Sequence, residues 1–387
     1  MTEKKKVAFI ANCCIVGGVE TALINLLNSF DTEKYDVTLY TNFAGNPVIG
    51  RIPDNIRCID LDEYNIKRVY NKAIGEHDYF TALKLMKNYA LFRITKDFYN
   101  KTAWLYRHIH FNDEHYDCVI AYNFGTSTIV LTNESFTAPK KVVWAHGDMP
   151  YFSNNYIRNL CLFDKCFCVS EYMKNYFVVH CKEMAPKTDI FHNLINAEEI
   201  VSKANESVSE CFNQYTYTIV TVGRLGTEKG QIMIPKAAKM LTEKGVSFVW
   251  YVVGDGIMRG KIENEIRNNE VEGKVILLGE KKNPFPYIKN SSIYVQTSTS
   301  EGWCMTTQEA RILHKPCVVT DIPVMHEQFI DGVNGIIANG TDAAALYEGI
   351  MRLISSQELR ERIVNNLKAE PQDGAVEMQK LYDFLDS

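Results

Sequence analysis

Short apolar runs of β character recur along this chain, and segments long enough to form a helix separate them. Strands that alternate with helices in this way predict parallel, doubly wound sheets of the α/β class. The runs expected to form strands are residues 7–12, 36–41, 56–61, 117–122, 141–146, 165–170, 188–192, 218–222, 248–253, 274–278, 292–297, 316–320 and 335–338. Because parallel sheets bind ligands at the carboxyl ends of their strands, a site is expected in the turns that follow these runs.

A polar stretch divides the strands into two groups. Residues 195–214 are rich in Asn, Ser and Glu, and a chain of 387 residues is long enough for about two domains. We therefore expect one Rossmann-like domain over 1–200 and a second over 201–370. A helix over 371–387 would follow and pack back on the first domain.

Charge and composition narrow the class of protein. A formal net charge of −5 argues against a general nucleic-acid-binding protein, which would be strongly basic. No apolar run approaches the ~18 residues of a transmembrane helix, and the charged start leads directly into the first strand, so no signal peptide is expected. Eleven cysteines, an odd number, fit reduced thiols in the cytoplasm better than a disulfide framework.

Four cysteines lie close together in the sequence, at positions 161, 166, 168 and 181, with His180 beside the last of them. Zinc sites use two closely spaced ligand pairs, whereas Cys166 and Cys168 alternate within a strand-like run. Alternation places both thiols on one face of a strand, where free cysteine packs as a small hydrophobe. We expect a packed core at this cluster rather than a metal site.

The stretch 300–309 concentrates polar chemistry behind an apolar run. Glu301 and Gly302 follow the run directly, and Glu309 lies about one turn into the helix-like segment after it. The amides of a helix N-terminus bind anions, and carboxylates accept hydrogen bonds from sugar hydroxyls. A site with both groups suits a phosphorylated sugar. The simpler alternative is two solvated glutamates at a helix start, which the helix dipole also favours.

Two turns in the first half are further candidates for a site. Gly17 and Gly18 let the backbone approach a ligand closely, although they do not form the Gly-x-Gly-x-x-Gly pattern of a dinucleotide site. The pattern at 254–260 is one residue too long for the same fingerprint, and no Gly-Lys-Ser/Thr marks a P-loop. His146 ends the run 141–146 and opens a His-Gly-Asp turn, although most histidines at such places are simply packed.

A series of motifs runs through the second half of the chain. In order they are Val222-Gly223-Arg224-Leu225, Glu228-Lys229-Gly230, Gly254-Asp255-Gly256, Ser300-Glu301-Gly302 with Glu309-Ala310, Pro316-Cys317-Val318-Val319-Thr320-Asp321 and Asn334-Gly335. Each motif alone is weak, but their order and spacing resemble the family 4 retaining glycosyltransferases. In the first half, Gly17-Gly18-Val19-Glu20 is similar to the Gly-Gly-x-Glu turn of that family and His146 to its active-site histidine, a looser likeness.

The resemblance implies the GT-B fold, in which two Rossmann-like, doubly wound domains face each other across a cleft. The second domain would bind a nucleoside-diphosphate sugar, with UDP favoured over GDP, and the first domain would bind a glycan, glycolipid or protein acceptor. Cell-surface polysaccharide synthesis is the expected setting. No metal and no cofactor besides the donor are expected.

The resemblance also implies that a basic pair binds the diphosphate and neutralises the negative charge of the leaving group. Arg224 and Lys229 would hold the diphosphate, a role that suits a bidentate guanidinium and a point-charge ammonium. The backbone amides of Cys304, Met305 and Thr306 would contact a phosphate. The positive charges of Arg224 and Lys229 would neutralise the leaving group without a metal.

The resemblance implies that the acidic residues and the histidine contact the donor sugar and the ribose. By the resemblance, Glu301 would bind hydroxyls of the donor sugar and Glu309 those of the ribose, while His146 would face the sugar from the other domain. Retention without a nucleophile fits a same-face displacement, in which the departing phosphate takes the acceptor proton. Glu301 and His146 are thus the expected catalytic residues.

Three positions differ from the family pattern. Trp303 and Cys304 occupy positions where the family often has Phe-Gly, which would reshape the sugar pocket. His314 stands where the family has a helix-ending glycine, and histidine tolerates the left-handed backbone region better than most residues. The usual Asn-Gly of the family near the linker reads Asn193-Leu194 here.

Asp60 and Asp62 resemble the metal-binding acids of another glycosyltransferase architecture but are expected to be a strand end.

Two other functions remain open on the sequence. A sugar-nucleotide epimerase with the same fold would need no acceptor and would release no glycosyl product. A degenerate, non-catalytic partner subunit would be expected to have lost Arg224, Lys229 or Glu301, all of which are present.

The segment 64–110 differs from its surroundings and reads as an insertion between strands. It holds nine Lys or Arg residues, three acids and ten aromatics with helical periodicity. Basic and aromatic residues together suit an anionic membrane surface, so a peripheral position on the inner face of a membrane is one expectation. The alternative is that the aromatics are core and the cations form a solvated face.

Overall fold

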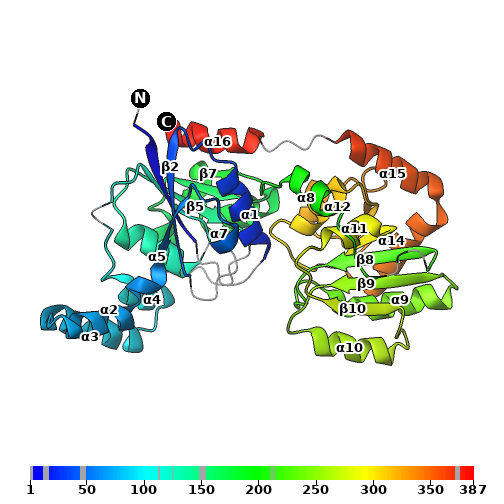
Figure 1. The fold of residues 1–387 in the computed structure, drawn as a ribbon, viewed down its shortest axis with the longest axis horizontal. Helices are drawn as coiled ribbons and strands as arrows, with labels where there is room; N and C mark the ends of the chain where they lie inside the picture. The colour runs from blue at the N-terminus through cyan, green and yellow to red at the C-terminus, as the bar shows by residue number, and fades with distance from the viewer. Residues whose placement is uncertain are drawn as a thin grey trace. The chain divides into compact units, whose positions relative to one another are not determined.

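The computed structural model describes residues 3–11, 17–43, 49–111, 114–123, 125–147, 154–210, 212, 214–370 and 375–387, and the chain divides into two compact units (Figure 1). Residues 1–194 and 374–387 form the first unit, and residues 195–373 form the second. The boundary falls between Leu194 and Ile195 rather than after residue 200. Each unit is an α/β layer structure around one parallel sheet.

The first unit has a seven-stranded sheet in the order β3-β2-β1-β4-β5-β6-β7, with every neighbouring pair parallel. Its strands are β1 (Lys5–Ile10), β2 (Tyr35–Thr41), β3 (Arg57–Asp60), β4 (Cys118–Ala121), β5 (Lys140–Ala145), β6 (Lys165–Cys168) and β7 (Thr188–Ile190). The order turns back at β1, which is the doubly wound arrangement. The central strands β1 and β4 are almost wholly apolar because helices cover both faces of a parallel sheet.

Helices of the first unit include the connections between these strands. They are α1 (Gly18–Asn28), α2 (Ile66–Gly75), α3 (Tyr79–Ile94), α4 (Phe98–Tyr106), α5 (Thr126–Ser135), α6 (Asn154–Leu160) and α7 (Glu171–His180). The expected insertion at 64–110 is the run α2-α3-α4 between β3 and β4. Asp78 and Asp97 begin α3 and α4 by accepting hydrogen bonds from Thr81 N at 3.0 Å and Asn100 N at 2.9 Å.

The carboxyl-terminal helix α16 (Ala375–Asp386) packs on the first unit, although its residues follow the second (Figure 1). The ring of Tyr382 stacks on Tyr35 with centroids 5.1 Å apart, and its hydroxyl accepts a hydrogen bond from Asp31 N at 2.8 Å. Glu377 contacts His192 Nδ1 at 3.0 Å. These contacts bind the end of the chain to the sheet near its start.

The second unit has a six-stranded parallel sheet in the order β10-β9-β8-β11-β12-β13. Its strands are β8 (Tyr217–Val222), β9 (Phe248–Val253), β10 (Val275–Gly279), β11 (Ile293–Gln296), β12 (Cys317–Val319) and β13 (Ile336–Ile337). Its helices are α8 (Ala197–Lys203), α9 (Ile234–Glu243), α10 (Arg259–Asn268), α11 (Phe285–Asn290), α12 (Met305–Ile312), α13 (Pro323–Gln328), α14 (Ala343–Ser355) and α15 (Gln357–Ala369). The thirteen strands predicted from the sequence are all present in the two units.

The second sheet separates two apolar cores. Ile219 and Trp250 face one core, which α9 and α14 cover, whereas Val220 and Tyr251 face the other. Adjacent residues of a strand point to opposite faces, so both cores draw on the same strands. Burial of both faces fixes the register, and with it the positions of the turns at the strand ends.

Cysteine packing in the first unit follows the sequence expectation in part. Cys166 and Cys168 on β6 are fully buried with sulfurs 3.8 Å apart, as expected for one face of a strand. Cys161, Cys181 and Glu183 bring their possible ligand atoms within 4.8 Å of one another. Burial raises the pKa of the Cys181 thiol to about 12, which opposes the thiolate form that a metal needs. 

Candidate active site

The candidate site lies at the carboxyl edge of the second sheet, where β8, β9 and β11 end. Parallel strands end at the same edge, so the turns after Val222, Val253 and Gln296 come together there. The backbone N–H of Leu225 donates to Asp255 O at 2.9 Å, which joins the first two turns. The sequence separation of these turns is large, and only the parallel sheet makes them neighbours.

Glycines allow the turns to pack this closely. Gly230 has a φ of +65°, and a Cβ atom there would lie 2.1 Å from Thr297 O. A Cβ on Gly254, whose φ is +139°, would lie 2.0 Å from Gly223 O. No side chain fits at either distance, so both positions require glycine.

Lys229 and Glu301 form an ion pair at the centre of this edge. The distance from Nζ to Oε1 is 2.6 Å, and the two side chains are only 22% and 9% exposed. Burial alone would lower the pKa of Lys229, but the Glu301 carboxylate outweighs burial and holds the pKa above its ordinary value. The two residues that the sequence placed in separate roles are therefore direct partners in this structure.

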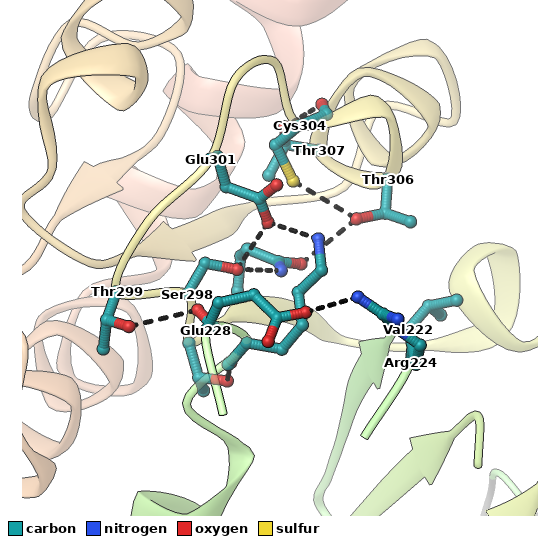
Figure 2. A network of polar contacts seen from close by, with 12 residues as sticks. Val222, Arg224, Glu228, Ser298, Thr299, Glu301, Cys304, Thr306 and Thr307 are labelled. Atoms are coloured by element: carbon teal, nitrogen blue, oxygen red, sulfur yellow. Dashed lines mark hydrogen bonds and ion pairs between the residues drawn. The ribbon is translucent and has the colours of Figure 1, made fainter. Parts of the chain in front are cut away.

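Glu301 is held in place by further polar groups at the end of β11 (Figure 2). Ser298 Oγ donates to Glu301 Oε1 at 2.6 Å, and Gln296 Nε2 donates to Ser298 Oγ at 2.8 Å. Tyr294 and Thr306 both donate to Gln296 Oε1, at 2.8 and 3.2 Å. This chain fixes the carboxylate on the rigid strand, as a site for an oriented ligand requires.

Gln296 and Ser298 were not singled out from the sequence, where they belonged to a strand. A signal was nevertheless present, because polar residues ended an otherwise apolar run. Both side chains are buried, and buried polar groups are nearly always hydrogen-bonded.

Arg224 lies at the outer side of the same network (Figure 2). Its guanidinium contacts Glu228 at 2.7 Å, and its side chain is 62% exposed. Burial would raise the pKa of Glu228, but its own backbone N–H and Arg224 hold that pKa below its usual range. Glu228 was quoted in a motif without a role, and the structure shows that it orients Arg224.

The helix α12 begins beside Glu301. Cys304 is its N-cap residue and makes no side-chain capping bond. Thr307 Oγ1 lies 2.7 Å from Cys304 O and 2.6 Å from Gln328 Oε1, so that hydroxyl is used within the protein. Burial raises the pKa of Cys304 to about 11, which keeps its thiol neutral. What α12 offers a ligand is its backbone amides and the positive end of its dipole.

Glu309 lies one turn into α12, as the sequence predicted, and it differs sharply from Glu301. Its side chain is 8% exposed, and within the described residues it has no hydrogen-bonding or ionic partner. Burial raises its pKa to about 8, so near neutral pH a large share of it is protonated. A carboxyl group in this state can exchange hydrogen bonds with hydroxyls and gains a partner when a ligand arrives.

His146 follows β5 in the first unit and is enclosed by aromatic rings. Its ring centroid lies 4.6 Å from that of Tyr122 and 6.5 Å from that of Trp144. Burial lowers its pKa to about 3, so the imidazole is neutral at physiological pH. Among the residues that the structure describes, neither ring nitrogen has a hydrogen-bonding partner within normal geometry.

The other first-half candidates are only partly described. Gly17 is the N-cap of α1, where a Cβ atom would meet Glu20 Oε2 at 2.9 Å, and Gly18 opens the helix. Residues 12–16 of that turn and Asp148 of the His-Gly-Asp turn lie outside the described residues. The catalytic and binding roles expected for Gly17, Gly18 and His146 stay predictions.

Asp60 ends β3 as the sequence predicted. Its carboxylate accepts a hydrogen bond from Asp62 N at 2.9 Å and so begins a short 3₁₀ helix. Asp62 accepts one from Asn42 at 2.7 Å beside a cavity of about 120 Å³ that Tyr64, Tyr106 and others line. That cavity could not be predicted from the sequence, because its lining comes from separate elements.

His314 shows the predicted left-handed conformation at the end of α12. Its φ is +54°, and its N–H donates to Arg311 O at 2.9 Å. The departure from glycine therefore leaves the helix end intact.

Comparison with known proteins agrees with this architecture. Solved structures with the same fold include Anabaena HepE in complex with UDP, which has a TM-score of 0.72 at 17% identity and covers 98% of this chain and 99% of that one. The fold is GT-B. Residues 202–370 match the family model described as glycosyl transferases group 1. The family match lies within the second unit, and the solved structures show the fold of the whole chain.

Curated relatives vary in how much of their length the match includes. An uncharacterised glycosyltransferase of Methanocaldococcus jannaschii is 30% identical over 145 residues, which are 37% of this chain and only 36% of that protein. The UDP-Gal:alpha-D-GlcNAc-diphosphoundecaprenol alpha-1,3-galactosyltransferase of Escherichia coli is 22% identical over 379 residues, 94% of this chain and 93% of that protein. The first match spans about a third of its relative's length.

Proposed function

We propose that this protein is a retaining, metal-independent glycosyltransferase of the family 4 type. It moves a sugar from a nucleoside-diphosphate sugar, with UDP preferred to GDP, to a glycan or lipid-linked glycan acceptor in polysaccharide synthesis. The observation that carries the proposal is the buried Lys229–Glu301 pair, fixed beside the start of α12 at the carboxyl edge of the sheet. A cation, a carboxylate and helix amides in one place match the parts of a nucleotide sugar.

The diphosphate is bound by Lys229, Arg224 and the amides at the start of α12. Phosphate oxygens compete with Glu301 for the ammonium of Lys229 and with Glu228 for the guanidinium of Arg224. The carboxylate that Lys229 releases is then close to the sugar and accepts hydrogen bonds from its hydroxyls. Glu309 gains the ribose hydroxyls as its first partners.

The transfer proceeds on one face of the sugar. The bond from the anomeric carbon to the phosphate oxygen breaks, and its electron pair stays on the phosphate. The bond from that carbon to the acceptor oxygen forms, and the acceptor proton passes to the departing phosphate. Lys229 and Arg224 stabilise the charge that develops on the leaving group, while His146 serves as a neutral hydrogen-bonding group.

Two relatives support the donor and acceptor classes. The Escherichia coli relative is named for UDP-galactose and a diphosphoundecaprenol acceptor, and the Anabaena HepE structure contains UDP. A UDP-sugar and a lipid-linked acceptor are therefore the first substrates to try.

The experiment is a panel of UDP- and GDP-sugars, with and without polyprenyl-diphosphate glycan acceptors. Release of nucleoside diphosphate and a sugar with retained anomeric configuration in the product are the expected results. Interconversion of sugar epimers without an acceptor would instead identify an epimerase. Absence of both reactions, together with no rise in melting temperature on adding any nucleotide, would indicate a non-catalytic subunit.

Adding a chelator to the transfer assay tests whether the reaction proceeds without a metal ion. EDTA should leave the rate within about twofold, because Lys229 and Arg224 supply the positive charge that a metal would otherwise provide. Loss of activity with EDTA and its return with Mg²⁺ would contradict the proposal.

A further inference from the structure

The hairpin of α2 and α3 lies at an edge of the first unit (Figure 1). It carries a large exposed apolar surface. On α3, Phe80 is 82% exposed and Leu83, one turn further, is 65% exposed. The large apolar side chains exposed on the hairpin and its ends are Ile74, Tyr79, Phe80, Leu83, Met86, Tyr89 and Ile94. Ala82 and Leu85 are buried, so α3 is apolar on both its packed and its outward side, a pattern typical of a helix with neighbours all round.

A groove between the two helices extends this surface. It has a volume of about 440 Å³, and Ile66, Tyr70, Met86 and Tyr89 line it together with Lys67. Apolar atoms make up nearly all of its lining. Contiguous exposed apolar surface of this kind marks an interaction site.

Cations surround the apolar surface. The exposed ones are Lys67, Arg68, Lys72, Lys84, Lys87, Arg93 and Lys96. Of the three acids in the segment, Asp78 and Asp97 are occupied as helix caps, and Glu76 lies 4.0 Å from Lys72. The hairpin is thus strongly basic in a protein whose net charge is −5.

The structure separates the two alternatives that the sequence left for this segment. On α4 and its flanks the aromatics are packed: Tyr99 is buried, and Arg107 lies over the Trp104 ring at 4.1 Å. On α2 and α3 the aromatics Tyr79, Phe80 and Tyr89 are exposed among exposed cations. The core interpretation holds for α4, and the surface interpretation applies to the hairpin alone.

We propose that the α2–α3 hairpin docks this protein on an anionic lipid bilayer, with Phe80 and Leu83 inserted among the acyl chains and the surrounding cations against the headgroups. Charge selects this occupant. A second copy in a two-fold contact would bring the same seven cations against themselves, which repels. A neutral apolar partner would leave the cations without a role, whereas an anionic bilayer satisfies both the apolar surface and the charge.

The docking depends on the hairpin and not on transfer chemistry. The docked protein would receive a lipid-linked acceptor from the same bilayer, and this second step rests on the proposed function. Phosphate headgroups and the acceptor diphosphate share their chemistry, so the docking test uses vesicles that contain no acceptor.

The test is flotation of the full chain with vesicles of phosphatidylcholine alone and of phosphatidylcholine mixed with phosphatidylglycerol, at low and high salt. Binding is expected only to the mixed vesicles and should weaken in high salt, which screens charges beyond a few ångströms. Each cation near an anionic surface is worth roughly fivefold in binding, so Lys84→Glu with Lys87→Glu should weaken it at least ~25-fold. Phe80→Glu with Leu83→Glu should weaken it at least ~10-fold.

The matched control variants carry the same kinds of substitution at exposed positions outside the hairpin. Lys236→Glu with Lys261→Glu reverses two exposed lysines of the second unit, and Leu162→Glu with Val179→Glu replaces two exposed apolar residues of the first. Both controls should float like the wild type. All four variants change exposed side chains, so each should keep the wild-type melting temperature and nucleotide binding.

Three outcomes would overturn the docking. They are equal binding to both vesicle types, binding unaffected by the hairpin variants, and no binding at all. A dimer in sedimentation that Phe80→Glu with Leu83→Glu dissociates, without vesicle binding, would assign the surface to a second copy. If flotation fails while sugar transfer to a soluble acceptor persists, the docking is wrong and the proposed function stands. If the protein floats but transfers no sugar, the docking stands and the proposed function is wrong.

Discussion

Glu301 in the second unit and His146 in the first both follow a buried strand, but their surroundings differ. Glu301 is paired with Lys229 and Ser298 at 2.6 Å each. His146 is enclosed by Tyr122 and Trp144, and within the described chain its ring nitrogens have no partner. Glu301 thus has an ionic and a hydrogen-bonding partner, whereas the buried His146 ring has no hydrogen-bonding partner of normal geometry among the described residues.

This difference indicates how each site prepares for a ligand. An unsatisfied buried polar atom costs about 1–3 kcal/mol, which a ligand group or water recovers when it supplies the missing hydrogen bond. At Glu301 the ion pair holds the carboxylate and ammonium in position, so a ligand exchanges existing partners instead of adding one. The site of the second unit is therefore held by charge pairing, whereas His146 lies among aromatic rings.

The largest effect is expected from Glu301→Gln, which removes the charge but keeps the volume. Sugar transfer should fall on the order of a hundredfold or more, because a fixed group that binds the reacting sugar is lost. Nucleoside-diphosphate binding should persist or tighten, since Lys229 no longer has a carboxylate competing with phosphate. Turnover assays and calorimetry on the same variant measure both.

The control for this change is Glu358→Gln, an exposed glutamate on α15. It should transfer sugar at the wild-type rate. If Glu301→Gln transfers sugar at the wild-type rate, Glu301 is not in the active site. The comparison between Glu301 and His146 would then fail as well.

Gly230→Ala tests whether the charged site depends on the close packing of its turns. Gly230 and Gly245 have similar φ values, +65° and +77°, but only the Cβ at 230 would meet Thr297 O, at 2.1 Å. Gly245→Ala should cost about 1 kcal/mol of the free energy of unfolding from backbone strain. Gly230→Ala should cost about 2–3 kcal/mol more, as measured by urea unfolding. Equal costs would show that the turns can separate freely.

Alanine substitutions of Arg224 and Lys229 separate binding from stability. Each should weaken nucleoside-diphosphate binding by about 1.5–3 kcal/mol in calorimetry, the value of a charge-assisted hydrogen bond. Only Lys229→Ala should also lower the free energy of unfolding measurably. Lys229 is the buried partner of Glu301, whereas the exposed Arg224–Glu228 pair is worth about 0–1 kcal/mol. Unchanged affinity in both variants would refute the diphosphate site.

The sequence was sufficient to predict the strands but not the side-chain contacts within the site. Short apolar runs rich in β-branched and aromatic residues, such as 248–253, favour buried strands, and their order places Arg224, Glu301 and Glu309 at one sheet edge. The Lys229–Glu301 pair could not be predicted, because it joins residues 72 positions apart whose side-chain geometry depends on the Gly230–Thr297 contact. The exposure of Phe80 was equally hidden, since helical periodicity does not reveal which face of a hairpin lacks a neighbour.

The smallest effect is a pH dependence of stability from His146. Burial lowers its pKa from 6.5 to about 3, so between these values the unfolded chain binds a proton that the folded chain does not. Stability contributed by the neutral imidazole is thus complete above pH 6.5 and is lost as the pH falls toward 3. At pH 5 the loss is about 2 kcal/mol, at 1.4 kcal/mol for each pKa unit.

His146→Gln keeps a polar side chain but removes this titration. Its free energy of unfolding should fall less steeply than that of the wild type between pH 7 and 5, and His110→Gln, an exposed control, should follow the wild-type curve. Urea titrations at a series of pH values give the slopes. If the curves of His146→Gln and the wild type are parallel, the imidazole is hydrated or paired in the folded protein. His146 would then resemble Glu301, and the contrast between a satisfied and an unsatisfied strand end would fail at the histidine.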